Sequence, residues 1–509
     1  MSNGTAYEYF TSHIVGRKRA LFYLGRHFSG EEVRSRIDGV AAFLKGKGIA
    51  KGDVVAINLP NTPECIFTIY AINKLGAIAF VTHPLLPIEA LREGIRETGS
   101  KMLVCMDSLK GEVGVPKLLC DGIGYLPQTK RLFARLLRKK GSAEGEKFPY
   151  GAIGAFDEAQ GTETDVALYL PSGGTTGEPK IIRVTNEAFN RNAEATESLA
   201  KMPLQGHGVL LILPFFHGFG LSSSLHGVVS GGAEGVIMPY PDYKRAARYA
   251  KKGMADVLLA VPNMYRKLLA EPLFRKGIGR VELAFAGGDT LSPALKKEYD
   301  DLSVAAGGKS RLYQGYGLAE TVSVCVSNSR EADKAGSIGK PVLAEVRILN
   351  EEGGVLPVGA IGEIAVKTPC MMKGYLGQED FSEEYLRTGD LGSLDEEGFL
   401  HFSGRKKRII VIGGMNIYPL EIERAAEEVD FVEGAAAVEY REGNKPKIAL
   451  FISDKSELPE KRKEEILLDY LSRRIIRYAL PSRIVFTERF PLTSVGKVDY
   501  LALADSLSH

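Results

Sequence analysis

Cysteine is scarce in this sequence and is not arranged in pairs. The five cysteines stand at Cys65, Cys105, Cys120, Cys325 and Cys370, an odd number without any C-x-x-C spacing. This pattern argues against a disulfide framework and against a cysteine-based zinc site. We therefore expect a reducing compartment and predict a cytoplasmic location.

The sequence has no large excess of positive or negative charge, and it has no long hydrophobic run. The 65 Lys and Arg residues face 63 Asp and Glu, which leaves a net charge of +2. Such a balance gives no general argument for nucleic acid as a partner. No apolar run approaches the ~20 residues that span a bilayer. The first residues also lack the basic and apolar regions of a secretory signal. We expect a small-molecule substrate, no nucleic acid and no integral membrane segment.

One segment is locally basic. Residues 130–140 carry six Lys and Arg, with an apolar helical stripe of Leu132, Phe133, Leu136 and Leu137. A helix lying on a membrane surface has this composition. So does an ordinary helix that packs one face on its own domain, and we predict the latter.

Short apolar runs alternate with helix-like segments along most of the chain. We predict buried strands at 53–59, 77–81, 209–213, 236–238, 257–261 and 281–285, and helices at 63–75 and 241–252. This alternation is typical of layered α/β structure with mostly parallel sheets, whose sites lie at the C-terminal ends of strands. The length of 509 residues predicts two or more domains.

The end of the chain is predicted to be a separate α+β unit. It is charged, poor in Gly and Ser, and has helix-like segments at 419–429 and 461–478. The local pattern changes at 404–408, where we place the boundary.

A predicted strand at 166–170 is followed by a loop suited to phosphate. Residues 171–180 are Pro-Ser-Gly-Gly-Thr-Thr-Gly-Glu-Pro-Lys. Glycines let backbone N–H groups approach an anion, hydroxyls add donors, and Lys180 adds a positive charge. The run lacks the Gly-Lys-Ser/Thr ending of the P-loop, so another fold would have to handle the phosphate. A flexible connection is the alternative interpretation.

Two further segments suit a nucleotide. Residues 314–321, Gln-Gly-Tyr-Gly-Leu-Ala-Glu-Thr, place the Tyr316 ring between glycines, where it can stack on a base. Glu320 follows four residues later and is a suitable ligand for Mg²⁺. Asp390, within Tyr-Leu-Arg-Thr-Gly-Asp-Leu, can accept hydrogen bonds from both ribose hydroxyls.

Basic residues mark two later segments. Residues 404–410, Gly-Arg-Lys-Lys-Arg-Ile-Ile, are basic at the predicted boundary. Residues 491–499, Pro-Leu-Thr-Ser-Val-Gly-Lys-Val-Asp, set Lys497 on a glycine turn. Taken alone, Lys497 would be interpreted as a solvated surface lysine.

In order and spacing, these segments resemble the adenylate-forming superfamily of acyl-CoA synthetases, aryl and fatty acid ligases, luciferases and nonribosomal peptide adenylation domains. The resemblance covers roughly residues 30–500. It implies an α/β protein with a large multi-sheet N-terminal domain over residues 1–404, a hinge over 405–407, and a small mobile α+β lid domain over 408–509.

The resemblance implies roles for the nucleotide-binding residues. The β- and γ-phosphates of ATP are assigned to Ser172, Gly173, Gly174, Thr175, Thr176, Gly177 and Lys180. Tyr316 is expected beside adenine, and Asp390 with Arg405 is expected to hold the ribose. The other residues assigned to cofactor binding are Gly288, Gln314, Gly315 and Gly317. Glu320 is the expected Mg²⁺ ligand. Lys497 is expected between the substrate carboxylate and the α-phosphate, where a positive charge stabilises the transition state.

One segment resembles the acyl-CoA synthetase form of the family: Ile412-Gly-Gly-Met-Asn-Ile-Tyr-Pro419. The resemblance implies that Gly413 and Gly414 let a pantetheine arm pass close to the backbone. A tight turn between two strands is a compatible interpretation. Two positions depart from the commonest pattern. Ala319 stands where many relatives have Thr, which removes a hydroxyl, and Lys407 stands at the hinge where many have Asp.

The acid is implied to bind against His217, Phe219, Ala286, Gly287, Gly317, Leu318 and Val322. His217 would border the carboxylate and the thiol path, with a neutral core histidine as the alternative. Enzymes that activate α-amino acids typically place an Asp in this region, and none stands in 213–226. A buried ammonium without a partner would be costly, so an aliphatic or aromatic acid is expected.

The resemblance thus implies an ATP-dependent carboxylic acid–CoA ligase that acts through an acyl-AMP and releases AMP and pyrophosphate, with Lys497, His217 and Glu320 as catalytic residues. A ligase that loads the phosphopantetheine of an acyl or peptidyl carrier protein is the nearest alternative. Residues 362–375 lack the insertion that fatty acyl-AMP ligases tend to carry. A light-producing oxygenase and a non-catalytic nucleotide-binding scaffold are more distant alternatives.

Overall fold

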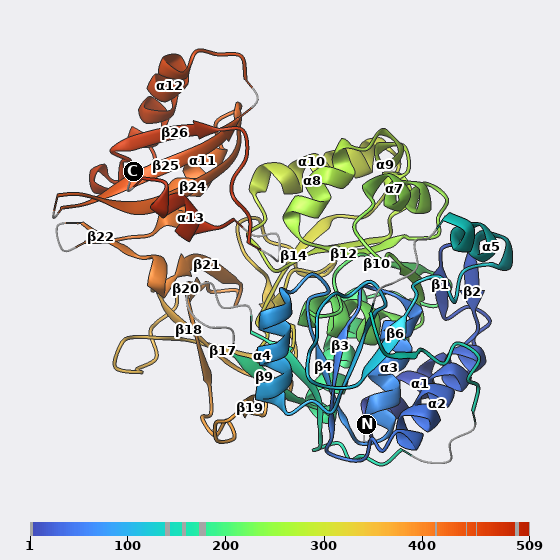
Figure 1. Ribbon diagram of the computed structural model, residues 1–509. Coiled ribbons are helices and arrows are strands. Elements are labelled where there is room, and N and C mark those ends of the chain that lie inside the picture. Colours follow the sequence, from blue (N-terminus) through green and yellow to red (C-terminus); the bar gives the residue numbers. More distant parts are fainter. Residues whose placement is uncertain are drawn as a thin grey trace.

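The computed structural model describes residues 4–137, 143–154, 159–172, 180–412, 415–443, 445–454, 456–493 and 498–507. Within these residues, two large sheets form the body of the N-terminal four hundred residues (Figure 1). Strand pairing is parallel across most of both sheets; it is antiparallel at both edges of the first sheet and at the β19 edge of the second. The predicted α/β class with mostly parallel sheets is confirmed.

The first sheet has the strand order β16-β15-β14-β13-β12-β10-β11-β1-β2. Its strands are β1 (Leu21–Tyr23), β2 (Arg26–Phe28), β10 (Gly208–Leu211), β11 (Glu234–Ile237), β12 (Val257–Ala260), β13 (Leu283–Ala286), β14 (Leu312–Gly317), β15 (Val324–Ser327) and β16 (Lys340–Pro341). The second sheet has the order β19-β9-β8-β4-β3-β5-β6-β7. Its strands are β3 (Val54–Asn58), β4 (Ile78–Val81), β5 (Met102–Met106), β6 (Lys117–Cys120), β7 (Glu146–Lys147), β8 (Val166–Pro171), β9 (Ile181–Thr185) and β19 (Gly374–Tyr375).

Helices pack between and outside these sheets. They are α1 (Ala6–Ile14), α2 (Gly30–Gly46), α3 (Pro63–Lys74), α4 (Ile88–Thr98), α5 (Gln128–Leu137), α6 (Asn186–Ala200), the π-helix η1 (Phe219–Val229), α7 (Tyr243–Lys251), α8 (Pro262–Ala270), α9 (Pro272–Arg275), the 3₁₀-helix η2 (Ile278–Arg280) and α10 (Pro293–Ala305). Every residue of α3 is buried, and its cluster includes side chains from both sheets. Most of its side chains are apolar, as burial of every face requires, and its buried Lys74 pairs with Asp38 at 2.6 Å. Thr62 caps it and Pro63 starts it, as a helix N-terminus favours.

A third, antiparallel sheet follows, with the order β17-β18-β20-β21. Its strands are β17 (Glu345–Leu349), β18 (Gly362–Lys367), β20 (Leu386–Leu394) and β21 (Leu400–Arg405). The β20–β21 hairpin pairs Asp390 with Arg405 directly across the two strands. The hairpin therefore fixes both of these predicted ribose-binding residues on one rigid element.

The remainder forms a small unit beside the large one, in orange and red (Figure 1). Its elements are η3 (Lys406–Arg408), β22 (Ile410–Ile412), β23 (Met415–Ile417), α11 (Pro419–Glu427), β24 (Val432–Glu442), β25 (Lys445–Asp454), α12 (Glu460–Ser472), η4 (Arg477–Ala479), β26 (Arg483–Thr487) and α13 (Tyr500–Asp505). Two apolar clusters of described residues lie wholly within it. We call it the C-terminal unit; its division from the rest at 404–408 stays a prediction.

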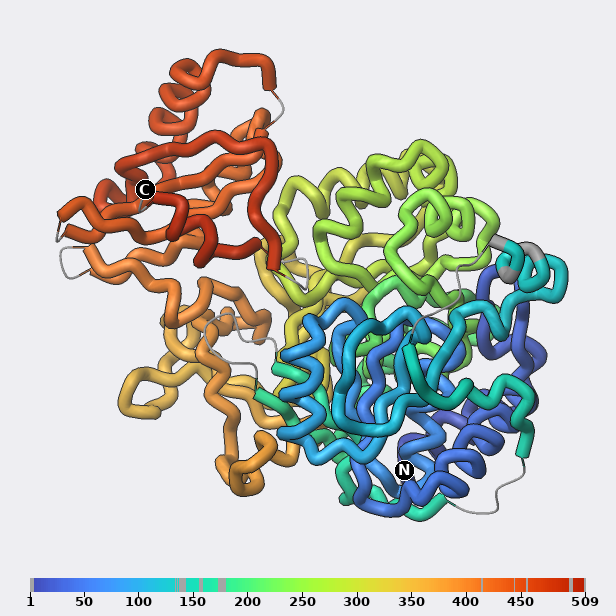
Figure 2. Tube along the Cα trace, viewed as in Figure 1, coloured from blue at the N-terminus to red at the C-terminus, as the bar shows by residue number. Residues whose placement is uncertain are grey.

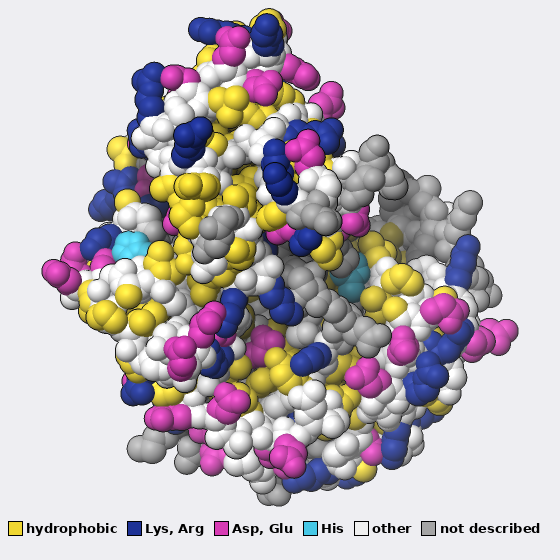
Figure 3. All heavy atoms as spheres, turned by 90° about the vertical axis from the view of Figure 1, so that its left-hand side faces the viewer, with side chains coloured by type: hydrophobic (Ala, Val, Ile, Leu, Met, Phe, Trp, Pro, Cys, Tyr) yellow, Lys and Arg dark blue, Asp and Glu magenta, His cyan; other side chains and the backbone are white. Residues whose placement is uncertain are grey.

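In Figure 2 the red end of the chain runs along the side of the C-terminal unit that faces the first sheet. On the face seen in Figure 3, Lys and Arg side chains are interspersed with Asp and Glu, so neither sign dominates that face. Among the described helices, none combines the length and the hydropathy needed to cross a membrane.

One local expectation is wrong, and a second is tested only in part. The helix predicted at 461–478 ends at Ser472, because the chain turns there and packs Ile475 and Leu480 on the core of the C-terminal unit. The apolar stripe of α5 was predicted to pack on the domain, and neither of its two described side chains is buried. Leu132 is 66% exposed and Leu136 is 78% exposed.

Candidate active site

A cavity of about 580 Å³ opens between the first sheet, the third sheet and the C-terminal unit. The predicted site residues that line it are His217, Phe219, Ala286, Gly287, Gly288, Gln314, Gly315, Tyr316, Gly317, Leu318, Glu320, Val322, Asp390, Arg405 and Lys407. These residues come from segments far apart in the sequence. The structure therefore brings together what the motifs suggested, although their roles stay predictions.

Tyr316, Asp390 and Arg405 form a connected group at one end of the cavity. The Tyr316 hydroxyl donates to Oδ2 of Asp390 at 2.8 Å, and Nε of Arg405 lies 3.4 Å from Oδ1 of the same carboxylate. Burial, and then the Asp390 carboxylate, raises the pKa of Tyr316 well above its ordinary value. The hydroxyl thus remains a donor and fixes Tyr316 against Asp390, whose side chain is 4% exposed.

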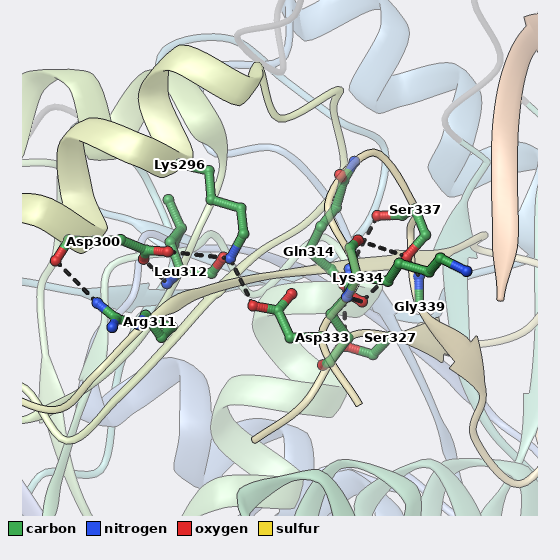
Figure 4. Close-up of polar contacts among 11 residues, drawn as sticks. Lys296, Asp300, Arg311, Leu312, Gln314, Ser327, Asp333, Lys334, Ser337 and Gly339 are labelled. Atoms are coloured by element: carbon green, nitrogen blue, oxygen red, sulfur yellow. Dashed lines mark hydrogen bonds and ion pairs between the residues drawn. The ribbon is translucent and has the colours of Figure 1, made fainter. Parts of the chain in front are cut away.

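Polar contacts hold the strand that carries Gln314 and Tyr316 from behind (Figure 4). Lys296 donates to the carbonyl oxygen of Leu312 at 2.9 Å and to Asp333 at 2.9 Å. Ser327, on the neighbouring strand β15, donates to the Gln314 carbonyl oxygen at 3.3 Å. The segment that follows β15 is tied in turn by Ser337, which donates to the Lys334 carbonyl oxygen at 2.9 Å. The wall assigned to adenine is thus rigid.

The glycines of this wall differ in what surrounds them. A Cβ on Gly317 would clash with the carbonyl oxygen of Ser323, whereas one on Gly315 would lie 3.4 Å from Oγ of Ser327. Gly288 has a φ of +79°, in the left-handed region that favours glycine. The sequence predicted all three as binding residues. The packing adds a steric reason for glycine at position 317.

The 171–180 loop is described only at its two ends. The Ser172 N–H donates to the Lys180 carbonyl oxygen at 2.7 Å, and the Lys180 N–H donates to the Ser172 hydroxyl at 3.0 Å. The predicted phosphate ligands Gly173, Gly174, Thr175, Thr176 and Gly177 lie outside the described residues. The ends are therefore closed together at the close of β8 and the start of β9, as a hairpin requires.

Glu320 contacts a residue that the motifs did not single out. Its Oε1 accepts a hydrogen bond from the Tyr375 hydroxyl at 3.0 Å. The Lys180 ammonium lies over the ring of the same tyrosine, with Nζ 4.6 Å from the ring centroid. Tyr375 stands in the sequence run Lys-Gly-Tyr-Leu-Gly, which carries no chemical signal of such a contact.

The loop that carries His217 is braced by a second missed residue, Asn61. Its amide donates to the carbonyl oxygens of Leu211 and Leu213 at 3.1 and 2.8 Å, and its oxygen accepts the Phe215 N–H at 3.0 Å. The strand predicted at 209–213 therefore stops at Leu211, because Asn61 replaces the sheet as partner. His217 lies two residues beyond this clamp.

Val322 has a strained backbone at the cavity wall. Its φ is +62°, a region that β-branched residues rarely adopt, and its side chain is fully buried. A Cβ on Gly218 would clash with the Val322 carbonyl oxygen. Strain of this kind is retained where the surrounding structure over-determines the conformation, and it occurs often at functional sites.

A second end of the cavity, which we call the acyl arm, runs between α6, η1 and strands β12 and β13. It is lined by Thr196, Leu199, Ala200, Phe219, Ser223, Val228, Leu259, Leu283 and Phe285. No Asp, Glu, Lys or Arg stands among these described lining residues. Its hydroxyls already have partners: Thr196 donates to the Asn192 carbonyl oxygen at 2.9 Å, and Ser223 bonds the Ser323 hydroxyl at 2.8 Å.

Sequence reasoning found Phe219 in this arm but missed the residues on α6. No motif surrounds them, and Leu199 and Ala200 look like ordinary core positions of an amphipathic helix. Only the packing of α6 against η1 turns them toward a cavity.

The C-terminal unit contributes the remaining wall. Thr493 and residues 498–501 line the cavity, and Lys497, with residues 494–496, lies outside the described residues. Gly413 and Gly414 also lie outside them; the strands on either side, β22 and β23, pair as a hairpin in which Val411 is half exposed.

The start of the C-terminal unit is tied to the segment after Lys497. Arg408 pairs with Glu423 at 2.6 Å, and its guanidinium lies 3.5 Å from the ring centroid of Tyr500. The predicted hinge residue Lys407 directly precedes this arginine. A movement at Lys407 would therefore carry Tyr500 with it.

Comparisons with known proteins agree with this geometry. The family model for AMP-binding enzymes matches residues 13–376. The chain belongs to the AMP-binding enzyme family. A long-chain-fatty-acid–CoA ligase of Bacillus subtilis is 30% identical over 521 residues, covering 94% of this chain and 90% of that protein. A feruloyl-CoA synthase of an Amycolatopsis species is 26% identical over 487 residues, covering 92% and 91%.

A solved structure also resembles the fold of this family member. The crystal structure of an anthranilate CoA ligase in complex with anthranoyl-AMP has a TM-score of 0.85 over 99% of this chain and 98% of that one, at 22% identity. At this identity the likeness shows the fold alone, with its large N-terminal and small C-terminal parts.

Proposed function

We propose that this protein is an AMP-forming acyl-CoA synthetase that activates an apolar carboxylic acid. The observation that carries the proposal is that several parts of the site line one cavity. It joins the Tyr316, Glu320 and Asp390 motifs to an uncharged arm and to the residues on either side of Lys497. A pure nucleotide-binding scaffold would need neither the arm nor that lysine.

In the first half-reaction, a carboxylate oxygen of the acid attacks the α-phosphorus of ATP. The bond from that phosphorus to the bridging oxygen breaks, and pyrophosphate leaves. Asp390, held by Tyr316 and Arg405, accepts hydrogen bonds from the ribose hydroxyls. Lys180 pairs with the negative charge of the β- and γ-phosphates. Lys497 stabilises the charge that develops between carboxylate and α-phosphate.

Glu320 offers one carboxylate for Mg²⁺. Within the described residues, no group of three His, Cys, Asp or Glu side chains is arranged to hold a metal alone. A single carboxylate beside substrate phosphates is the usual way that proteins bind this ion, so the residues present fit it. When bound, Mg²⁺ would offset the phosphate charge. Glu320, which follows β14 and lines the cavity, would hold it.

In the second half-reaction, the sulfur of CoA attacks the acyl carbon of the adenylate. AMP leaves with the bonding electron pair, and the thiol proton is lost. His217, held by the Asn61 clamp, borders the reacting carbon. The acceptor arm would pass Gly413 and Gly414 after the C-terminal unit turns at Lys407.

The acyl arm favours an aliphatic or aromatic acid. None of its described side chains is charged, and its hydroxyls bond to the protein itself. An ammonium or a second carboxylate in the arm would lose its hydration without gaining a partner, which is costly. The Bacillus subtilis relative is named for long-chain fatty acids and the Amycolatopsis relative for ferulate, so both kinds of acid belong in a test.

The test is ATP–pyrophosphate exchange with a panel of acids, followed by addition of CoA. The panel contains fatty acids of increasing length, ferulate, benzoate, malonate and amino acids. We expect exchange with one or more of the uncharged apolar acids, and AMP release when CoA is added. An amino acid with the highest kcat/KM would contradict the substrate class, and no exchange with any acid would favour the scaffold.

A second acceptor separates the two ligase types. The same adenylate is offered CoA or a phosphopantetheinylated carrier protein, and thioester is measured by mass spectrometry. We expect thioester with CoA. If exchange occurs but CoA releases no AMP, and the carrier is loaded, then the acceptor is the carrier protein and not CoA.

A further inference from the structure

Tyr375 is fixed by its backbone between two parts of the proposed phosphate site. On β19 it pairs with Ile182 of β9, the strand that begins directly after Lys180. The Leu376 N–H donates to the Ile181 carbonyl oxygen at 2.8 Å. The position of the tyrosine is therefore set by the same hairpin that ends the 171–180 loop.

The segment before Tyr375 holds Glu320 as well. The Met372 N–H donates to the Glu320 carbonyl oxygen at 2.8 Å, and the Tyr375 hydroxyl donates to the Glu320 carboxylate at 3.0 Å. Glu320 is thus anchored twice by one short stretch, once through its backbone and once through its side chain.

The hydroxyl and the ring of Tyr375 contact groups of opposite charge. The hydroxyl donates its one hydrogen bond to the Glu320 carboxylate. The negative face of the ring attracts the Lys180 ammonium at 4.6 Å. A single rigid side chain can therefore orient an anion and a cation at once.

We propose that Tyr375 is a positioning residue that orients Glu320 toward the Mg²⁺ and Lys180 toward the phosphates of ATP. This inference rests on the proposed function, since it takes the ligand to be Mg²⁺-ATP. The hydroxyl acts through Glu320 and the ring acts through Lys180. The two contributions can be separated by substitution.

Tyr375→Phe removes the hydroxyl and keeps the ring. We expect the Mg²⁺ concentration for half-maximal exchange to rise about tenfold, while the KM values for ATP at saturating Mg²⁺ and for the acid change less than twofold. Tyr375→Leu also removes the ring, so the KM for ATP should then rise severalfold. A residue that only filled space would not separate metal from nucleotide in this way.

A binding measurement without turnover gives an independent readout. Mn²⁺, as a probe for Mg²⁺, is titrated into the protein with the nonhydrolysable analogue α,β-methylene-ATP and followed by electron paramagnetic resonance. The Mn²⁺ affinity of the ternary complex should fall about tenfold in Tyr375→Phe. In Glu320→Gln, the added Tyr375→Phe change should cost no further affinity, because the metal-binding carboxylate that the hydroxyl orients is gone.

Tyr470 offers a matched control on α12, outside the cavity. Its hydroxyl donates to Glu428 at 2.6 Å, and the Arg474 guanidinium lies 5.0 Å from its ring centroid. Tyr470→Phe removes the same kind of bond and should leave Mn²⁺ affinity and Mg²⁺ dependence unchanged. Melting temperatures of all variants show whether each is folded.

Equal Mn²⁺ affinity in Tyr375→Phe and the unmodified protein would overturn the inference. So would an additive loss in the double variant. Failure of every acid in the exchange assay is a different result: it would reject the proposed reaction, while the Mn²⁺ titration with the analogue would still decide whether Tyr375 orients Glu320.

Discussion

The two ends of the cavity are built by different means. At the nucleotide end, Tyr316, Asp390 and Arg405 bond to one another, and the strand beneath them is braced by Lys296 and Ser327. In the acyl arm most lining side chains are apolar, and the hydroxyls of Thr196 and Ser223 bond to neighbouring protein groups rather than to one another. From this difference we infer that one end would bind a fixed ligand by directed bonds, and that the other would accept a class of ligands by shape.

The largest effect is expected at Lys497, which we propose stabilises the charge between carboxylate and α-phosphate. Lys497→Ala should lower adenylate formation by about two to three orders of magnitude, the loss typical for one group that stabilises transition-state charge. Thioester formation from supplied acyl-AMP should remain largely intact. The two half-reactions are measured separately, by pyrophosphate exchange and by CoA-dependent AMP release.

Gly414→Leu is the reciprocal variant. A side chain there should obstruct the pantetheine arm and spare the ATP site, so thioester formation falls and exchange persists. If folded Lys497→Ala and Gly414→Leu proteins each lose both half-reactions equally, Lys497 and Gly414 do not act in alternation. The hinge prediction at Lys407 would then fail as well.

The next effect concerns the nucleotide end alone. Asp390→Asn removes the charge that Arg405 pairs with and weakens the bond from Tyr316. Hydrogen bonds to charged groups contribute about 1.5–3 kcal/mol, so the KM for ATP should rise about 10- to 100-fold. The relative preference among acids should not change, which exchange kinetics with two acids of different length would establish. A changed acid preference would mean that the two ends are coupled.

The same difference explains what the sequence could predict. Tyr316, Glu320, Asp390 and Arg405 stand in short motifs of glycine, aromatic and charged residues, because directed bonds need particular chemical groups at particular spacings. The structure brings them to one cavity, and the mostly parallel α/β sheets were predicted from strand and helix alternation.

The arm could not be predicted, because apolar residues at helical spacing look the same in a core and in a pocket. Leu199, Ala200 and Val228 belong to it only through the packing of α6 against η1. Asn61 and Tyr375 were missed for another reason. Each acts on a residue distant in the sequence, and its own surroundings carry no motif.

A pair of glycines tests how tightly the nucleotide wall is packed. Gly317→Ala should destabilise the protein by about 1–3 kcal/mol, the usual cost of overpacking, because the added methyl group clashes with the Ser323 carbonyl oxygen. Gly315→Ala should change stability by less than about 0.5 kcal/mol, since its methyl would make an ordinary contact with Ser327. Urea unfolding of both variants measures the difference. Equal stabilities would show that this wall yields as easily as a surface loop.

The smallest effect is expected in the arm, and it should be selective. Ala200 lines the arm at the end of α6 and is 2% exposed, so Ala200→Phe places a ring in the space that a long acid would occupy. Overpacking costs of about 1–3 kcal/mol correspond to a roughly 5- to 150-fold loss of kcat/KM for acids long enough to reach α6. Short acids and the KM for ATP should change less than about twofold.

Ser198→Phe is the control for this variant, because Ser198 lies on the same helix with its side chain exposed to solvent. It should leave the profile of kcat/KM against acid length unchanged. The profile is measured for both variants and the unmodified protein with fatty acids of increasing length. A uniform loss at all lengths in Ala200→Phe would mean that the ring disturbs the wall shared with the nucleotide. The arm would then not be the separate, shape-selecting end that its uncharged lining indicates, and the contrast between the two ends of the cavity would not hold.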